Sequence, residues 1–251
     1  MELREFFTQH PRVALAFSGG VDSSYLLYAA RQWAEKVGVY YVRSAFQPEF
    51  EVRDALRLAE ELGSDVRLLR ADVLGCDAVT ANPADRCYHC KQVIMSTIRA
   101  AAAEDGYTLV IDGTNASDEI SDRPGFRALE EQGILSPLRI CGLSKAEIRR
   151  LSREVGLFTW NKPAYACLAT RIPTGERITA EKLAAVEAGE SALAAMGFTD
   201  FRLRSPEGRA WLQFTAEQLP VARARFDEIC AALAPHFSAI AIDPKEREKS
   251  V

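Results

Sequence analysis

Residues 14–24 read ALAFSGGVDSS, an apolar run that ends in two glycines and a short polar segment. The apolar part predicts a buried strand over 13–17, and we expect a helix to begin near Asp22. Backbone N–H groups around Gly19 and Gly20 can approach an anion closely because no Cβ stands in the way. The N-terminus of the following helix favours the same negative charge. The stretch therefore predicts a phosphate-binding loop at the carboxyl end of a strand.

The polar side chains of this loop fit the same interpretation. Ser18 and Ser23 offer hydroxyl groups, and a carboxylate at Asp22 is useful beside phosphates when Mg²⁺ bridges them. The loop has neither the lysine of a Walker A motif nor the G-x-G-x-x-G spacing. It resembles the PP-loop of the ATP pyrophosphatases, which implies cleavage of ATP to AMP and pyrophosphate. The alternative is a plain turn in which Asp22 caps a helix.

Composition narrows the class of protein. Of the 251 residues, 48% are hydrophobic and 26% charged, which is ordinary for a globular protein. A net charge of −4 argues against a broad nucleic-acid surface. We see no secretory signal and no apolar run near the ~20 residues of a membrane span, so we expect a cytoplasmic protein without a membrane partner. The six cysteines are then thiols or metal ligands rather than disulfides.

Strand-like and helix-like stretches alternate over roughly the first 160 residues, which is typical of a parallel α/β sheet. The expected helices cover 23–35, 50–62 and 90–104, and the expected strands cover 38–42, 65–69 and 108–111. After a turn at 173–175, we expect a helix over 179–196, strands over 201–204 and 210–214, a helix over 216–233 and a strand over 239–242. We therefore predict a PP-loop ATP pyrophosphatase domain (adenine nucleotide alpha hydrolase-like) over 1–172. A smaller α+β domain would cover 173–251.

A second polar segment follows the strand expected at 108–111. It reads Asp112-Gly113-Thr114-Asn115, and ligands of such sheets bind outside the carboxyl ends of the strands. By itself the segment is an ordinary turn, but beside a PP-loop we interpret it as a nucleotide contact. The expected neighbours of adenosine are Phe17, Ser44 and Gly113. The polar residues that follow hold a metal or substrate, or form a solvated loop; they are Asp118, Glu119, Asp122 and Arg123.

The cysteines separate the possible functions most strongly. Cys87 and Cys90 lie at the start of a predicted helix, and Cys167 lies in the segment 166–171, ACLATR. A structural zinc site takes four ligands, and His89 between the first two cysteines is badly placed to be the fourth. A redox pair, or a Cys167 that is only a small buried side chain, remains an alternative. Three thiolates on a cubane cluster would leave one iron open to another ligand.

Five segments in this order resemble the LarE family of ATP-dependent sulfur transferases, which act in the synthesis of the nickel-pincer nucleotide cofactor. They are RCYHCK at 86–91, DGTN at 112–115, RPGFRAL at 123–129 with SPL at 136–138, and ACLATR at 166–171. The resemblance runs from about Arg12 to Phe214. It implies a PP-loop domain, a small C-terminal domain and a homo-oligomer, trimeric or hexameric. The implied substrate is pyridinium-3,5-biscarboxylic acid mononucleotide, which becomes the bis-thiocarboxylic acid.

Two sulfur chemistries occur in this family. In one, the cysteine matching Cys167 gives up its own sulfur and becomes dehydroalanine. In the other, that cysteine and a Cys-x-x-Cys pair, here Cys87 and Cys90, hold a 4Fe–4S cluster with an extra sulfide, which is then replaced from sulfide or a sulfur donor. The presence of the pair favours the cluster version. Arg202 and Arg204 share a face of a predicted strand and suit a phosphate. They are solvated side chains in the alternative, whereas the resemblance favours the substrate's ribose phosphate.

The resulting hypothesis places the ATP phosphates on Ser18, Gly19, Gly20 and Ser23, with Mg²⁺ near Asp22. A substrate carboxylate attacks the α-phosphorus, and sulfide then displaces AMP. We expect Asp22 and Cys167 to be the catalytic residues, with Lys91 or Arg171 steadying the oxyanion. The rival functions are a tRNA thiolase, an amidating enzyme similar to NAD synthetase, and a redox-sensing iron–sulfur module in which ATP is regulatory.

Overall fold

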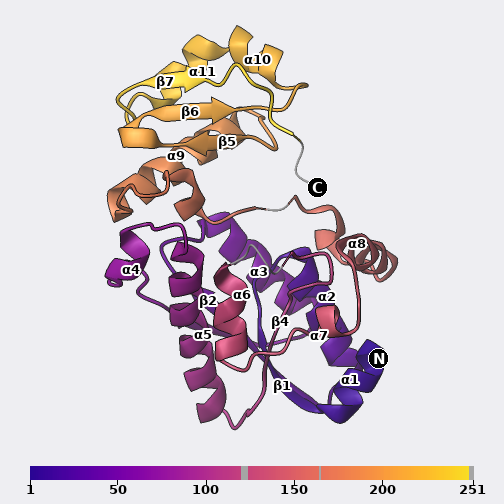
Figure 1. The fold of residues 1–251 in the computed structure, drawn as a ribbon. Coiled ribbons are helices and arrows are strands. Elements are labelled where there is room, and N and C mark those ends of the chain that lie inside the picture. Colours follow the sequence, from indigo (N-terminus) through magenta and orange to yellow (C-terminus); the bar gives the residue numbers. More distant parts are fainter. Residues whose placement is uncertain (120–123, 164, 249–251) are drawn as a thin grey trace. The chain divides into compact units, whose positions relative to one another are not determined.

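The computed structural model describes residues 1–119, 124–163 and 165–248. The chain forms two compact units (Figure 1). Unit 1 consists of Met1–Ser44, Glu49–Val73 and Asp85–Lys162, and unit 2 of Ala45–Pro48, Leu74–Ala84 and Pro163–Val251. Unit 2 therefore takes two short segments from the first third of the chain.

Unit 1 is built on a parallel sheet of four strands in the order β3-β2-β1-β4. The strands are β1 (Arg12–Ala16), β2 (Lys36–Arg43), β3 (Val66–Arg70) and β4 (Val110–Asp112). Leu15 of β1 pairs with Val39 on one side and with Ile111 on the other. The chain runs from β1 outward to β3 and then returns to β4 beside β1, so the strand order reverses between β1 and β4. Ligands of open α/β sheets bind at such a switch point.

Helices of unit 1 cover both faces of this sheet. One face carries α1 (Leu3–Gln9), α2 (Val21–Trp33), α3 (Glu49–Glu61), α7 (Pro137–Ile140), α8 (Lys145–Glu154) and the short helix η1 (Phe158–Asn161). The other face carries α5 (Arg86–Glu104) and α6 (Pro124–Glu131). The central strand β1 is buried on both faces in consequence, which is why it reads as a continuous apolar run, whereas no residue of the edge strand β3 is buried.

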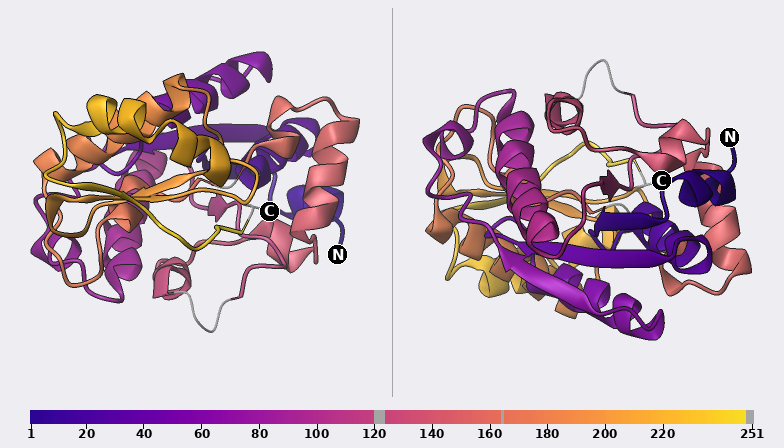
Figure 2. Two further views of the ribbon diagram at one scale, coloured as in Figure 1. Left: turned by 90° about the horizontal axis from the view of Figure 1, so that it is seen from above. Right: turned by 90° about the horizontal axis from the view of Figure 1, so that it is seen from below.

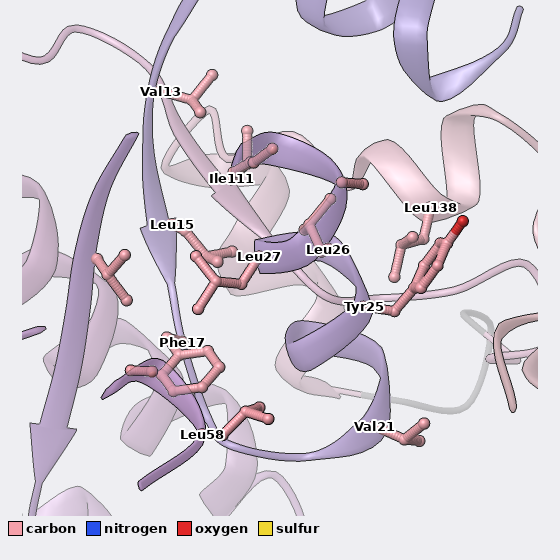
Figure 3. Packing of buried hydrophobic residues seen from close by; sticks show 14 of the residues in the cluster. Val13, Leu15, Phe17, Val21, Tyr25, Leu26, Leu27, Leu58, Ile111 and Leu138 are labelled. Atoms are coloured by element: carbon pink, nitrogen blue, oxygen red, sulfur yellow. The ribbon is translucent and has the colours of Figure 1, made fainter. Parts of the chain in front are cut away.

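The alternation of side chains along β1 divides the core into two clusters. Leu15 and Phe17 point into the cluster with Leu26 and Leu27 of α2 (Figure 3). Ala14 and Ala16, on the opposite face, belong to the cluster that contains Met95 and Ile98 of α5. The small alanines leave room for the larger side chains of α5.

Unit 2 contains a sheet in the order β5-β6-β7, whose strands appear in orange and yellow (Figure 2). Its strands are β5 (Arg202–Arg204), β6 (Ala210–Gln213) and β7 (Ile240–Ile242), with β5 antiparallel and β7 parallel to β6. Its helices are α4 (Asp77–Thr80), η2 (Leu168–Arg171), α9 (Ala180–Ala195), η3 (Pro206–Gly208), α10 (Leu219–Ala224) and α11 (Phe226–Leu233). Thr179 caps α9, because its side chain accepts a hydrogen bond from the Lys182 N–H at 3.3 Å.

The observed elements confirm the predicted α/β class and most of the predicted strands and helices, with one difference in unit 2. The helix predicted over 216–233 is two helices, α10 and α11, separated at Arg225 with φ −106° and ψ 21°. Pro220 lies in the first turn of α10, the part of a helix that tolerates a missing N–H. No helix in the described part of the chain is long and apolar enough to cross a membrane.

Candidate nucleotide and substrate sites

The loop after β1 is shaped by a glycine that no other residue can replace without strain. Gly19 has a φ of +73°, and a Cβ built on it would lie 2.5 Å from the Cβ of Ala55 in α3. Gly20 follows as the N-cap of α2 and provides no side-chain cap. The first turn of α2 therefore begins next to a tight loop of backbone, which is the arrangement that suits a phosphate group.

Two serines brace this loop from inside. Ser23 is buried, and its Oγ accepts a hydrogen bond from the Ser18 N–H at 3.3 Å and donates to the Gly20 carbonyl at 3.2 Å. The Ser18 and Ser23 hydroxyl groups lie 3.0 Å apart. Ser18 is exposed, so its hydroxyl is the one available to a ligand, whereas Ser23 holds the loop in shape.

The end of β4 meets the same helix turn. A Cβ on Gly113 would lie 2.9 Å from the Ser23 nitrogen and 3.1 Å from its Cα, so the close approach of the two segments requires glycine. Asp112 is buried and accepts hydrogen bonds from the hydroxyls of Thr114 and Ser136, both at 2.6 Å. The structure thus brings the loop after β1 and the loop after β4 together at the switch point of the sheet.

Asp22 faces a cation that the loop motif does not contain. Its Oδ2 accepts a hydrogen bond from Lys145 Nζ at 2.6 Å, whereas its Oδ1 is buried without a hydrogen-bond partner among the described residues. Burial raises the pKa of Asp22, while the ammonium of Lys145 lowers it. A buried carboxylate oxygen without a partner fits a hard cation such as Mg²⁺.

Lys145 is the residue of this site that the sequence reasoning missed. It is the first residue of α8, directly after the N-cap Ser144, which forms a capping box with Glu147. That capping box is visible in the sequence and marks a helix start. The contact of Lys145 with Asp22, 123 positions away, depends on tertiary structure.

Helix α5 brings two thiols and an amine toward this edge. Cys87 and Cys90 are three positions apart and so lie on one side of the helix, Cys87 exposed and Cys90 half-buried. Arg86 Nη2 lies 3.6 Å from Cys87 Sγ. Lys91 Nζ lies 3.9 Å from Asp112 Oδ2, and Asp112 directly precedes Gly113 in the chain.

The remaining residues predicted for unit 1 have mixed placements. The Phe17 side chain is 4% exposed and packs in the hydrophobic core, so it offers a nucleotide only its backbone (Figure 3). Ser44 is buried just after β2. Asp118 accepts a hydrogen bond from the Asn115 N–H at 3.0 Å. Asp122 and Arg123 lie outside the described residues.

In unit 2, a buried ion pair holds the segment that carries Cys167. Arg171 is 2% exposed and donates to both carboxylate oxygens of Glu190, at 2.7 and 3.2 Å, and to the Ala166 carbonyl at 3.1 Å. Burial lowers the pKa of Arg171, but the hydrogen bonds and charge of Glu190 outweigh this and hold it above its usual range. Arg171 therefore binds the carbonyl directly before Cys167 and, at 2.8 Å, the Thr170 hydroxyl after it. We interpret Arg171 as a positioning residue for this segment.

The two arginines of β5 lie against the same segment. Arg204 donates to the Thr170 carbonyl at 3.1 Å and to Gln213 Oε1 at 3.2 Å. Arg202 Nε is buried and has no hydrogen-bond partner among the described residues. Burial and the charges of Arg171 and Arg247 lower the pKa of both β5 arginines. This concentration of positive charge favours an anion beside the residues that follow Cys167.

Comparison with known proteins places the chain in a family. No protein-family model matches it. It is 38% identical over 219 residues to an uncharacterized protein of Synechocystis, with 86% of this chain and 81% of that protein covered. It is 35% identical over 195 residues to the pyridinium-3,5-bisthiocarboxylic acid mononucleotide synthase of Lactiplantibacillus plantarum, with coverages of 77% and 71%. The chain belongs to the LarE family.

A more distant match agrees with the fold of this LarE protein. It is 30% identical over 161 residues to the argininosuccinate synthase of Natronomonas pharaonis, with coverages of 58% and 39%. That enzyme is also a PP-loop protein, as expected for the loop at 18–24.

The three cysteines predicted as metal ligands are divided between the two units. Cys87 and Cys90 belong to unit 1 and Cys167 to unit 2. Over residues 1–119, 124–163 and 165–248, no three His, Cys, Asp or Glu side chains form a group that could hold a metal ion. The three-cysteine cluster therefore stays a prediction.

Proposed function

We propose that this LarE protein is an ATP-dependent sulfur transferase. It would adenylate the carboxylates of pyridinium-3,5-biscarboxylic acid mononucleotide and convert them into thiocarboxylates, with release of AMP and pyrophosphate. The observation that carries the proposal is the 35% identity, over 77% of this chain, to a synthase named for that product. Two features support it: the glycine loop after β1 in unit 1, which suits a phosphate, and Arg202 and Arg204 in unit 2, near the segment that carries Cys167.

The ATP site would be built from the two loops at the switch point. The backbone of Gly19 and Gly20 and the Ser18 hydroxyl would hold the phosphates, and Ser23 would keep the loop in shape. Gly113 and Ser44 would lie near the adenosine, with the backbone of Phe17. Asp22 would be a ligand of Mg²⁺, which when bound neutralises phosphate charge and stabilises the departing pyrophosphate.

Adenylation follows from this arrangement. A substrate carboxylate oxygen attacks the α-phosphorus, and the bond from that phosphorus to the pyrophosphate oxygen breaks. Lys145 would move from Asp22 to the phosphates and stabilise the charge that develops there. The carbonyl carbon of the acyl-adenylate then accepts a sulfur nucleophile, and AMP leaves with the original oxygen. Lys91 would steady the oxyanion of that second step.

Unit 2 would hold the other end of the substrate. Arg202 and Arg204 can form forked hydrogen bonds with a phosphate, and the unpartnered Nε of Arg202 gains an acceptor when they do. The charge of the phosphate also relieves the repulsion among the arginines that lowers the pKa of both residues.

Cys87, Cys90 and Cys167 would be the sulfur site. Three thiolates suit a 4Fe–4S cluster, which when bound has an iron open to a transferable sulfide. Within unit 2, the segment after Cys167 is anchored because the Leu168 N–H donates at 2.9 Å to the carbonyl of Phe46. Sacrifice of the Cys167 sulfur is the alternative. We also expect the protein to be a cytoplasmic homo-oligomer, trimeric or hexameric.

The test uses protein purified without oxygen and supplied with ATP, Mg²⁺, sulfide and the biscarboxylic mononucleotide. We expect AMP and pyrophosphate in equal amounts, together with thiocarboxylate product detected by mass spectrometry. Pyrophosphate release without substrate-dependent thiocarboxylate would reject the proposed substrate, and the absence of pyrophosphate would reject adenylation. Intact mass after turnover separates the two sulfur routes, since the sacrificial route leaves a chain lighter by one H₂S.

A further inference from the structure

An exposed tryptophan lies directly opposite one of the β5 arginines. Trp211 of β6 pairs with Arg204, and Gln213 of the same strand pairs with Arg202. Directly opposed residues of an antiparallel pair share a face of the sheet, so these four side chains form one surface, which we call the Arg–Trp face. Leu203 and Leu212 point to the opposite, buried face.

The Arg–Trp face is held in place by a chain of polar contacts. Gln213 accepts a hydrogen bond from Arg204 Nε at 3.2 Å and donates to Asp243 Oδ2 at 2.9 Å. The hydrogen bond from Gln213 lowers the pKa of Asp243, and the neighbouring Trp211 side chain contributes to the same effect. The carboxylate therefore orients the indole while Gln213 orients the guanidinium.

The indole surface itself is left open. Trp211 is 39% exposed, and its neighbour on the other side, across β6 and β7, is the small Ala241. A single exposed apolar side chain is common on protein surfaces. This one differs because it lies directly opposite Arg204 and on the same face as Arg202, whose buried Nε has no hydrogen-bond partner among the described residues.

We propose that the Arg–Trp face binds a mononucleotide, with its phosphate on Arg202 and Arg204 and its planar ring stacked on the Trp211 indole. The charge argues for the phosphate, since four arginines lie close together and, among the described residues, only Arg171 and Arg247 form ion pairs, with Glu190 and Asp200. The ring argues for Trp211, since indole is the best aromatic partner of a cation and a pyridinium ring is both planar and cationic. Phosphate and ring are neighbours within a mononucleotide, as Arg204 and Trp211 are across the strands. The inference rests on the proposed function, and it adds the group that recognises the ring.

The experiment compares the affinity of the biscarboxylic mononucleotide with that of ribose 5-phosphate, which has the phosphate but no ring. Calorimetric titration of the wild-type protein should give tighter binding of the mononucleotide. Trp211→Ala should weaken the affinity for the mononucleotide by about tenfold and leave the affinity for ribose 5-phosphate unchanged, because only the stacking contact with the ring is lost. Trp211→Phe should retain most of the affinity. Trp33→Ala is the matched control, since Trp33 is 37% exposed at the end of α2. This variant should change the affinity for neither ligand.

Two results would overturn this assignment. One is an unchanged mononucleotide affinity in Trp211→Ala, and the other is an equal loss for both ligands, which would mean that Trp211 only supports the arginines. Both are distinct from a failure of the proposed function. In that case the wild-type protein would form no thiocarboxylate, whatever the two affinities are.

Discussion

Lys145 Nζ lies 2.6 Å from Asp22 Oδ2 and joins the first turn of α8 to the first turn of α2. The side chains are 30% and 20% exposed, so a ligand at the phosphate loop can reach both. The pair brings a carboxylate and an ammonium to the start of one helix. Metal ion and phosphate need ligands of opposite charge, and this pair supplies one of each.

Replacement of Lys145 should impair the ATP half of the reaction. We expect Lys145→Ala to lower kcat/KM for ATP by about 100-fold or more, because the ammonium would stabilise charge on the departing pyrophosphate. Steady-state pyrophosphate release measures this. Lys182→Ala is a matched control, since Lys182 forms a similar ion pair with Glu176 at 2.6 Å in unit 2. Equal rates for wild type and Lys145→Ala would contradict the role.

Asp22→Asn should stabilise the protein while it abolishes adenylation. Burial raises the pKa of Asp22 above its usual 3.8, so the folded chain binds the proton more tightly than the unfolded chain. The ionised carboxylate therefore lowers the free energy of unfolding at neutral pH, and this cost disappears as the pH falls below 3.8. Thermal denaturation without nucleotide should show a higher Tm for Asp22→Asn at neutral pH, with a gap that narrows toward acid. A variant that is less stable at neutral pH would show that the pairing with Lys145 outweighs burial.

Gly113→Ala should separate the two loops of the nucleotide site. The new Cβ would lie 2.9 Å from a backbone nitrogen of α2, which cannot rotate away as a side chain can. We expect a loss of about 2 kcal/mol in the free energy of unfolding, together with weaker ATP binding. Gly125→Ala is the control, because its Cβ would lie 3.3 Å from the flexible Lys91 side chain and at an ordinary contact distance of 3.7 Å from the Cys87 carbonyl oxygen, and alanine favours a helix. Urea denaturation and nucleotide titration of both variants decide the matter.

The sequence predicts the backbone of this site better than it predicts the contacts of its side chains. The apolar run before Ser18 and the glycines after it predict strand, loop and helix, because those signals are local. The sequence predicts Phe17 as a neighbour of adenosine, and period-2 alternation places its side chain on the core face with Leu15, so only its backbone is open to a nucleotide. Lys145 and Glu190 have no local signal for their roles. Each meets its partner only after the chain has folded.

The ion pair of Arg171 with Glu190 should matter more for stability than any surface pair of unit 2. Glu190→Gln leaves a buried guanidinium without its counter-charge, and we expect the free energy of unfolding to fall by about 3 kcal/mol. A double variant, Arg171→Met with Glu190→Met, should regain most of this while sulfur transfer stays low, because nothing then holds the Ala166 carbonyl beside Cys167. Arg177→Met serves as control, since its pair with Asp77 is largely exposed and worth about 1 kcal/mol or less. Normal sulfur transfer in the double variant would show that the Arg171–Glu190 pair has only a structural role.

Cys87→Ala separates the two sulfur routes without touching the nucleotide loop. If the cluster route operates, the variant should bind no iron and form no thiocarboxylate after anaerobic reconstitution. Substrate-dependent pyrophosphate release should continue, because adenylation depends on Asp22 and the loop after β1. Cys76→Ala, which removes a half-buried thiol elsewhere in the chain, should keep both iron and product. If Cys87→Ala instead yields about one thiocarboxylate group per chain while Cys167 loses its sulfur, the sulfur comes from Cys167 itself. The Cys87–Cys90 pair is then no part of the transfer, since a sacrificed thiol needs no iron beside it.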